Sequence, residues 1–439
     1  MRTGSYALIW MILTFSVAAA DDWPQFRGPG GQGCSEASGL PLKWSETENI
    51  TWKTPITGLG WSSPVVLGDQ IWMTTADEKP ASEEEAKKRL RGNSMASSLE
   101  VAASVTWRAV CVDRKTGKVL RDVKLFTLEY PAPIHQMNSY ASPTPVLEPG
   151  RVYCDFGTYG TVCLDSTSGK ILWERTLPID HQVGPGSSPA LYGDLLVLVR
   201  DGCDKQYITA LDKKTGKTVW KTDRPPMATP IDHFRKAYST PLVIKSGGRD
   251  QMIVPGAQWV VAYEPASGKE IWRVDYGRQF STTSRPVFGH GMAYIGTGFI
   301  KAELWAIRPD GQGDVTKTHV AWKATRQIPK RSSPVLAGKE IYVVSDNGVA
   351  TCFDAETGET RWTERMAGDY SVSPVYAGGR IYFFSQDART TVLKPGKEYT
   401  KLAENQLEGR MLASPAFVDN AIFLRTNSHL YRIENRSQK

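Results

Sequence analysis

The strongest constraint on the fold is a short signal that recurs eight times, a residue followed by proline at the start of an apolar strand. After a longer first interval, the signals follow one another at roughly 40–50 residues. A repeat of this length, with four short strands in each copy, is typical of a β-propeller blade. The eight copies therefore predict an all-β, eight-bladed β-propeller. The eight prolines are Pro64, Pro143, Pro189, Pro241, Pro286, Pro334, Pro374 and Pro415.

Each repeat has the pattern of a four-stranded sheet, and the sixth copy shows it most clearly. Residues 335–336, 341–344 and 350–354 are short runs rich in β-branched and aromatic side chains with a period of two. Asn347-Gly348 marks a hairpin turn, because these residues tolerate positive φ angles. Thr357-Gly358 then leads to a fourth strand that carries Trp362. Tryptophan recurs at this position in other copies, which favours packing between neighbouring blades over a ligand surface.

The two ends of the chain predict how the ring closes. The eighth copy ends at residues 431–434 without a fourth strand, whereas residues 49–53 precede the first proline and resemble one. We expect this N-terminal strand to complete the last blade, because closure removes an exposed sheet edge.

The first interval is longer than the others by about 35 residues, and the excess lies in residues 77–106. Glu83, Glu84 and Glu85 each have a basic residue four positions later, which predicts one short helix. This insertion falls between the second and third strands of blade one.

The first 20 residues have the features of an export signal. Arg2 is followed by an apolar run and by Ala18-Ala19-Ala20, a small-residue cleavage site. An uncleaved anchor is the alternative. We expect residues 21–439 to form a single propeller domain that is periplasmic or extracellular, with no transmembrane span in the mature chain.

Charge excludes one class of partner. The net charge of +7 comes from 53 basic and 46 acidic residues distributed along the whole chain. No basic run of five residues occurs, so we expect no nucleic-acid partner.

The repeats resemble those of the quinoprotein-type, or PQQ-like, β-propeller family. The copy with Leu211-Asp212, Thr215-Gly216-Lys217 and Trp220 shows the family pattern, and the resemblance covers nearly all of the chain after the signal. The opening 22–28, Asp-Trp-Pro-Gln-Phe-Arg-Gly, looks like the start of many secreted bacterial members that are labelled BamB-like. The chain departs from BamB itself in having no cysteine at the cleavage point. It departs from quinoprotein dehydrogenases in having no two adjacent cysteines.

Two further motifs have structural interpretations. Residues 28–33 match G-x-G-x-x-G but lack a preceding strand and a following helix, so we expect a flexible lead-in rather than a nucleotide site. Cys154 and Cys163 flank a turn centred on 158–159. Symmetric folding of that hairpin would place them opposite each other and allow a disulfide, with the strain common in cross-strand bridges.

The main functional signal is a column of residues eight positions before each proline. Blades two, three and four carry His135, His181 and His233 there, and blades five and six carry Arg278 and Arg326. The loops that precede the blades open on one face of a propeller, near its central channel. Three positions before the proline, a second column adds an aromatic and basic rim. Its members are Trp61, Tyr140, Tyr238 and Arg331.

Three interpretations of the histidines remain open. They can be solvated loop residues, part of a mouth that binds a polar or anionic ligand, or a weak candidate for a three-histidine metal site. We expect a secreted, non-catalytic binding or scaffold propeller that presents this mouth to a ligand or a protein partner. The alternative is a PQQ-dependent or metal-dependent oxidoreductase, so the cofactor is unknown and PQQ is not favoured.

Overall fold

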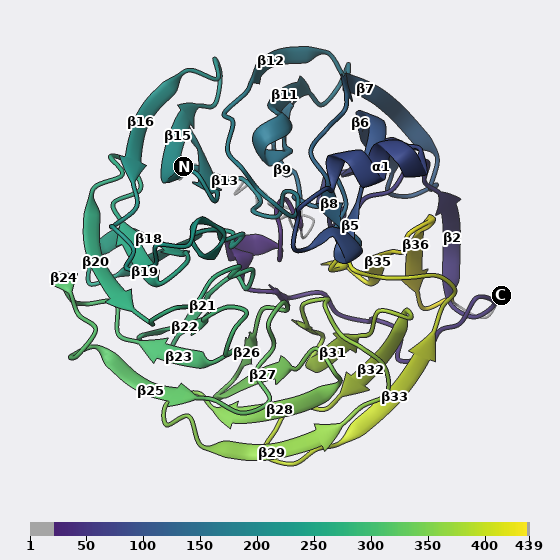
Figure 1. Cartoon of the computed structure of the whole chain (residues 1–439). Coiled ribbons are helices and arrows are strands. Elements are labelled where there is room, and N and C mark those ends of the chain that lie inside the picture. Colours follow the sequence, from purple (N-terminus) through teal and green to yellow (C-terminus); the bar gives the residue numbers. More distant parts are fainter. Residues whose placement is uncertain (1–21, 437–439) are drawn as a thin grey trace, which may run out of the picture.

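The computed structural model describes residues 22–436, which form a ring of eight four-stranded β-sheets around a central axis (Figure 1). Within each blade, neighbouring strands are antiparallel, and the fourth strand lies at the perimeter of the ring. The predicted all-β, eight-bladed propeller is confirmed. The expected signal peptide, residues 1–20, lies outside the described residues.

The strands of blades one to four, from the axis outward, are β3 (Val65–Leu67), β4 (Gln70–Pro80), β6 (Ala102–Asp113) and β7 (Val119–Glu129); β9 (Val146–Glu148), β10 (Arg151–Asp155), β11 (Thr161–Asp165) and β12 (Ile171–Arg175); β13 (Ala190–Tyr192), β14 (Leu195–Asp201), β15 (Gln206–Asp212) and β16 (Thr218–Asp223); and β17 (Leu242–Ser246), β18 (Arg249–Pro255), β19 (Trp259–Tyr263) and β20 (Glu270–Asp275).

Those of blades five to eight are β21 (Val287–Gly289), β22 (Met292–Gly296), β23 (Leu304–Ile307) and β25 (Val320–Ala324); β26 (Val335–Ala337), β27 (Glu340–Val344), β28 (Val349–Asp354) and β29 (Thr360–Arg365); β30 (Val375–Ala377), β31 (Arg380–Phe384), β32 (Arg389–Leu393) and β33 (Lys401–Gln406); and β34 (Ala416–Val418), β35 (Ala421–Arg425), β36 (His429–Glu434) and β2 (Ile50–Pro55). Two short parallel strands add to blades four and seven, β24 (Gly313–Asp314) on β20 and β1 (Cys34–Ser35) on β30.

Tryptophans of the outer strands pack between blades, as the repeat predicts. The indole of Trp173 in blade two covers Gly216 in blade three, where an added Cβ would lie 2.7 Å from the ring. Its Nε1 donates a hydrogen bond to the carbonyl oxygen of Lys213 at 3.1 Å. The left-handed backbone of this glycine (φ 69°) explains why the turn sequence ends in glycine. The same contact joins Trp52 to Gly117, Trp220 to Gly268 and Trp322 to Gly358.

The ring closes through its N-terminal strand, which confirms the prediction from the unequal chain ends. Strand β2 pairs antiparallel with β36 and becomes the outer strand of blade eight. Ile50 and Ile56 are buried in the same core as Phe423 and Leu430 of blade eight. Blade eight therefore has no uncovered outer edge at β36.

The segment 22–33 is a plug across the ring, and the prediction of a flexible lead-in is wrong. The segment, purple in Figure 1, runs through the middle of the ring. The backbone of Trp23 exchanges two hydrogen bonds with Val66 of blade one. The guanidinium of Arg27 is buried and donates to the carbonyls of Pro334 and Pro374 in blades six and seven, at 2.6 and 3.2 Å. These bonds connect blade one to blades six and seven through the plug, and Phe26 of the plug lies at one end of the channel.

The insertion in blade one contains the expected helix, α1 (Glu83–Arg89), which Ser82 caps by accepting a hydrogen bond from the backbone N–H of Glu85. Strands β4 and β6 continue to pair at both ends of the segment expected to be inserted, as far as Pro80 and Ala102. The longer interval is therefore partly an extended hairpin. Beyond α1, β5 (Leu99–Glu100) pairs with β8 (Ile134–His135) and joins the insertion to the loop that precedes blade two. Within residues 22–436, no helix has the length and apolar character needed to cross a membrane.

Candidate functional site

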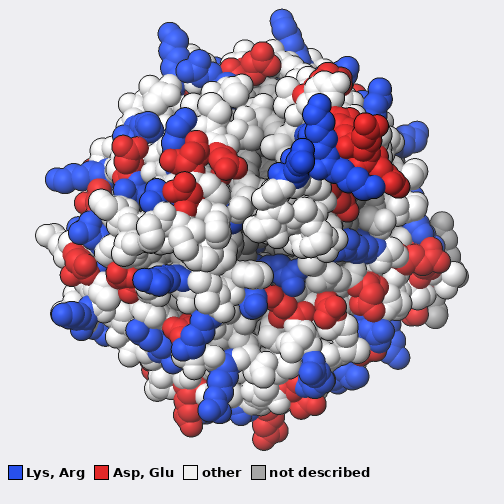
Figure 2. All heavy atoms as spheres, viewed as in Figure 1, with Lys and Arg blue, Asp and Glu red and all other residues white. Residues whose placement is uncertain are grey.

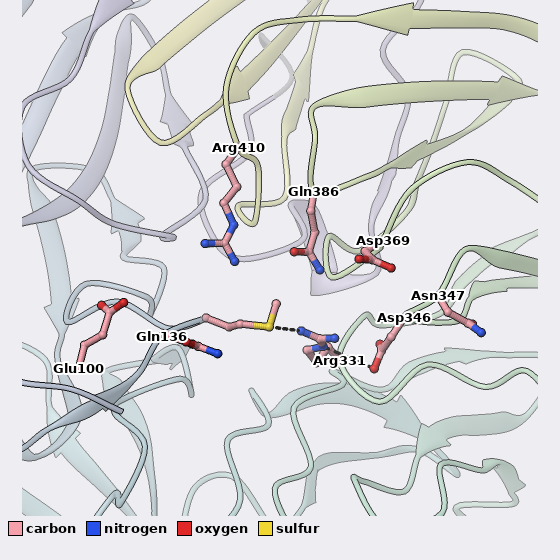
Figure 3. Close-up of a pocket in the computed structure, with 9 residues that line it drawn as sticks. Glu100, Gln136, Arg331, Asp346, Asn347, Asp369, Gln386 and Arg410 are labelled. Carbon is pink, nitrogen blue, oxygen red and sulfur yellow. Dashed lines mark hydrogen bonds and ion pairs between the residues drawn. The ribbon is translucent and has the colours of Figure 1, made fainter. Parts of the chain in front are cut away.

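A pocket of about 540 Å³, here called the mouth pocket, opens where the loops of several blades meet. We call this side of the ring the channel face. The loops that precede blades two, six, seven and eight contribute to it, together with the loops between the second and third strands of blades six and seven and the blade-one insertion. Figure 2 shows a hollow near the middle of the molecule, with basic and acidic side chains beside it. The nine lining residues are Glu100, Gln136, Met137, Arg331, Asp346, Asn347, Asp369, Gln386 and Arg410 (Figure 3).

Arg331 occupies the centre of the mouth pocket. Its Nη1 lies 3.0 Å from the sulfur of Met137, and its Nε lies 3.5 Å from Oδ2 of Asp346 (Figure 3). On the far side, the guanidinium of Arg410 lies 5.8 Å from the ring centroid of Trp61. Two further carboxylates and three amides complete the lining. The pocket therefore presents both signs of charge, which suits a polar ligand or a peptide that carries both.

Below the mouth pocket, a narrower channel of about 200 Å³ runs along the axis to the plug, where Phe26 lines it. Met137 and Arg331 line both spaces and form the boundary between them. The residue just before each blade's first proline faces this channel in seven blades, and it always bears a hydroxyl. Each hydroxyl accepts a hydrogen bond of 2.9–3.2 Å from the backbone N–H of its counterpart in the preceding blade. The seven residues are Ser63, Thr144, Ser188, Thr240, Ser333, Ser373 and Ser414.

This ring of seven hydroxyl residues corrects the register that the sequence analysis assigned to blade two. Thr144-Pro145, not Ser142-Pro143, precedes the first strand β9 and occupies the position that serine-proline holds in blade one. Two proline signals stand two residues apart there, and only the position of β9 distinguishes them. Counting eight residues back from Pro145 gives Met137, so His135 leaves the column and a residue of the mouth pocket replaces it.

The three histidines do not meet. His135 lies in β8, and its Nδ1 accepts a hydrogen bond of 3.1 Å from the backbone N–H of Met137. His181 is buried against Gly157 in the turn of blade two. His233 is exposed, with its ring edge-on to Phe234 at a centroid distance of 4.4 Å. Across residues 22–436, no cluster of three or more His, Cys, Asp or Glu side chains could hold a metal ion.

The other sequence candidates divide among three environments. Trp61 and Tyr238 line the axial channel, and Arg331 lies at the mouth. Tyr140 is a core residue, because its ring packs edge-on against Trp107 and its hydroxyl donates to the carbonyl of Ala132. Arg278 and Arg326 are exposed in the loops before blades five and six and line neither the mouth pocket nor the channel.

Cys154 and Cys163 are free thiols in the structure. Cys163 pairs with Tyr153 and Cys154 with Val162, so the two cysteines project from opposite faces of the sheet. The turn is centred on Thr158 alone, half a residue from the centre that we expected. That shift moves the pairing by one residue and reverses the face of one side chain.

Most residues of the mouth pocket were missed by the sequence analysis. Asp346 and Asn347 were interpreted only as a hairpin turn, and Gln386 was not considered. One signal could have found them: the loops between the second and third strands begin with serine in both blades six and seven, at Ser345 and Ser385. Aligning these loops places Asp346 and Gln386 at the same position, one residue later.

Burial of His181 predicts a specific acid sensitivity. Desolvation, assisted by the nearby charge of Arg200, lowers the pKa of His181 to about 3. The unfolded chain therefore binds a proton below about pH 6.5 that the folded protein excludes, and stability falls as the pH drops from there towards 3. Between pH 7.5 and 5.0, we expect the wild type to lose about 2 kcal/mol more than His181→Gln.

Urea unfolding at the two pH values measures this difference. His290→Gln, at an exposed turn, is the matched control and should lose as much as the wild type. Equal losses in His181→Gln and the wild type would mean that His181 is solvated. The lowered pKa also means that His181 stays neutral at pH 5.5 and adds no positive charge to a mouth.

The mouth pocket does not fit a calcium-bound quinone cofactor. Calcium takes six to eight oxygen ligands, and a planar quinone needs a flat surface on which to stack. None of the nine lining residues is aromatic, and the carboxylates of Glu100, Asp346 and Asp369 come from three different blades. The residues described here form no carboxylate cluster that could hold a metal ion. We therefore derive no redox step at this site.

Comparisons with known proteins agree with the architecture. A family model described as outer membrane protein assembly factor BamB matches residues 105–298 and 256–428. The chain is 28% identical over 272 residues to 1-butanol dehydrogenase (quinone) of Thauera butanivorans, a match that covers 57% of this chain and 39% of that protein. It is 25% identical over 182 residues to BamB of Burkholderia pseudomallei, covering 35% of this chain and 45% of that protein. The chain thus spans less than half the length of these curated relatives.

Solved structures show the same fold at low identity. BamB from Moraxella catarrhalis superposes with a TM-score of 0.52 at 13% identity, covering 82% of this chain and 99% of that one. A europium-containing methanol dehydrogenase gives 0.50 at 12% identity, covering 85% and 89%. These likenesses concern the fold alone. The family model, however, extends over most of the blades, and the chain therefore belongs to the BamB family of PQQ-like propellers.

Proposed function

We propose that the protein is an exported, non-catalytic scaffold propeller that binds a protein partner on its channel face. The observation that carries this proposal is a cluster of apolar side chains beside the mouth, in the loops before blades four and five and in the loop between β22 and β23. We call this cluster the aromatic patch. Its members are Ile231, Phe234, Phe280, Phe299 and Ile300.

The aromatic patch is continuous, with Phe234 and Phe280 half-buried and Ile231, Phe299 and Ile300 exposed. The ring centroids of Phe234 and Phe280 are 4.7 Å apart, and those of Phe280 and Phe299 are 6.2 Å apart. Phe299 and Ile300 keep 46% and 53% of their surface accessible. The other exposed large apolar side chains of the described residues, such as Val219, lie on the outer strands of the blades, apart from Tyr130 just after β7. A contiguous apolar patch on a loop face is typical of a protein interface, whereas scattered apolar residues are ordinary.

A lysine defines the chemistry of the partner. Lys330 is half-buried, and its ammonium lies 4.5 Å from the ring centroid of Phe299. Lys236 lies 5.2 Å from that of Phe280, but it is buried and donates to Gln182 and to the carbonyl of His233, so it supports the patch from inside. A partner segment that alternates acidic and apolar side chains would complement both the rings and the ammonium of Lys330. The mouth pocket next to the patch offers further polar contacts to the same partner.

The family supports an assembly role. Relatives are named as outer membrane protein assembly factors, and a function of this kind requires a rigid surface rather than a reactive centre. We place the protein in the periplasm or outside the cell, because its first 20 residues have the features of an export signal. The loops of the channel face would then present the patch to a partner in the cell envelope.

Site-specific photo-crosslinking in the producing cell tests this proposal. A photoreactive residue at position 299 should crosslink to a discrete partner, and the same residue at position 219, equally apolar but on an outer strand, should not. Phe299→Ala and Ile300→Ala together should weaken the interaction at least tenfold, because exposed aromatic anchors contribute most of the energy of an interface. Identical crosslinked products at 299 and 219 would contradict the proposal.

The oxidoreductase alternative makes a different prediction. Addition of PQQ and calcium to the purified protein should then produce a bound chromophore with a stoichiometric absorbance change. The scaffold proposal expects no such change, and a stoichiometric spectrum that is retained after gel filtration would overturn its non-catalytic part.

A further inference from the structure

The seven channel hydroxyls leave their hydrogens without an acceptor. Each oxygen accepts one backbone N–H from the preceding blade, as described above. Among the described residues, none of these seven hydroxyls donates a hydrogen bond to any protein group. All seven side chains are buried and all seven line the same space of about 200 Å³. Buried hydroxyls normally donate as well as accept, so the contents of this channel must supply the acceptors.

The remaining position of the hydroxyl ring, in blade five, supplies positive charge. Arg285 stands where the other blades have serine or threonine, and its backbone N–H donates to Ser333 in the common pattern. Its buried guanidinium turns to the plug, where it donates to the carbonyl of Phe26 and, at 3.1 Å, to Oε1 of Gln25. No carboxylate in the described part of the chain forms an ion pair with Arg285.

A second buried cation lies at the same end. The guanidinium of Arg27 donates to the carbonyls of Pro334 and Pro374, the residues that follow the channel hydroxyls Ser333 and Ser373. Desolvation lowers the pKa of Arg27 to about 10 and, together with the nearby charge of Arg27, lowers that of Arg285 to about 9. Carbonyls accept hydrogen bonds from both guanidinium groups, whereas Nε of Arg27 has no partner among the described residues, and these contacts leave the net charge in place.

The walls of the channel hold no acidic group. Arg331 lies at the boundary with the mouth pocket, where it forms an ion pair with Asp346, and none of the channel-lining residues is aspartate or glutamate. The two cations without a carboxylate partner at the plug end and the hydroxyl donors along the walls favour a negatively charged occupant over a cation. The channel has room for a small group with several oxygens and a few waters, since a water needs about 30 Å³.

We propose that the axial channel is a binding site for a small oxyanion of the phosphate or sulfate class, held by the ring of seven hydroxyls and by the field of Arg27 and Arg285. The ligand reaches it from the mouth pocket, past Met137 and Arg331. The site is separate from the aromatic patch, so it does not depend on the proposed partner binding.

The first test is isothermal titration calorimetry, in which inorganic phosphate or sulfate is added to the purified wild type. Thr144→Val and Thr240→Val keep the side-chain shape and remove one hydroxyl each. Because a hydrogen bond to a charged ligand is strong, we expect each variant to bind about tenfold more weakly, and the double variant about a hundredfold. The matched control is Thr209→Val, which removes a buried hydroxyl of blade three that donates to the carbonyl of Trp220, away from the channel.

A crystallographic measurement keeps the test independent of these variants. Wild-type crystals soaked in selenate should show an anomalous selenium peak on the axis within the ring of hydroxyls. Axial density that contains water only, or a selenium peak only at exposed arginines, would overturn the proposal. Equal affinity in the double threonine variant and in Thr209→Val would do so as well. Loss of crosslinking at position 299 would bear on the proposed partner but not on this site.

Discussion

A chain that lacks residues 22–56 should lose cooperative unfolding. This deletion removes strand β2 together with the plug, and it exposes the edge of β36 in blade eight. It also removes six buried apolar side chains from the largest core cluster. All but the alanine are large, and a large buried apolar side chain contributes about 1.5–3 kcal/mol, so the combined loss is comparable to the roughly 5–15 kcal/mol that stabilises a typical protein. The six are Trp23, Ala37, Leu40, Trp44, Ile50 and Ile56.

Differential scanning calorimetry and near-ultraviolet circular dichroism measure this effect. We expect a broad or absent transition, with loss of the fixed environment of the aromatic rings. A deletion that melted within a few degrees of the wild type would contradict the closure argument.

A second variant separates closure from the plug. Residues 49–56 can be attached after residue 436 through an Asn-Gly turn, because β2 and β36 are antiparallel and the backbone N–H of Glu434 already donates to Asn49. This chain restores the outer strand without residues 22–48. It should recover a cooperative transition at a temperature between those of the deletion and the wild type, with the remaining deficit caused by the missing plug.

Arg224→Met should destabilise the protein by about 3–5 kcal/mol, because it leaves the carboxylate of Asp201 buried without a partner. The two side chains are almost completely inaccessible, and Nη2 of Arg224 lies 3.0 Å from Oδ2 of Asp201. The same guanidinium donates to the carbonyl of Val254 and the hydroxyl of Tyr263, at 3.1 and 3.2 Å, so it joins blade three to blade four. Denaturant unfolding measures the change in the free energy of unfolding.

Two companion variants identify the cause. The double variant Arg224→Met/Asp201→Leu removes both charges and should recover much of the loss, since apolar groups of similar volume often replace a buried pair at little cost. Arg361→Met breaks a more exposed pair with Asp354 and should cost only about 0–1 kcal/mol. A loss in Arg224→Met no larger than that in Arg361→Met would mean that the buried pair contributes little.

The repeat and the ring closure were predictable because both depend on local patterns. Strands alternate with a period of two, the Thr-Gly turn requires a left-handed glycine, and most copies carry a tryptophan in the fourth strand that packs against the next blade. Residues 49–53 could be assigned to blade eight because only that blade lacked a fourth strand. Arg331 was also placed near the channel, because the column that contains it was counted in the correct register.

Other features could not be predicted because they depend on contacts between distant segments. The plug sequence around Arg27 has few apolar side chains and no regular period, and it is held by carbonyls of blades six and seven. In blade two, two prolines compete for one position, and the choice depends on where β9 pairs with β10. An error of two residues there placed His135 in a column that belongs to Met137.

The sequence by itself therefore determined the number of blades, the four-stranded pattern of each, the packing of tryptophans between them and the strand that closes the ring. These features follow from periodicity within single repeats. Only the tertiary structure decided which side chains share the mouth pocket and the axial channel. Their residues come from the loops of several blades, and closure of the ring brings them together although no local pattern connects Glu100, Arg331 and Arg410.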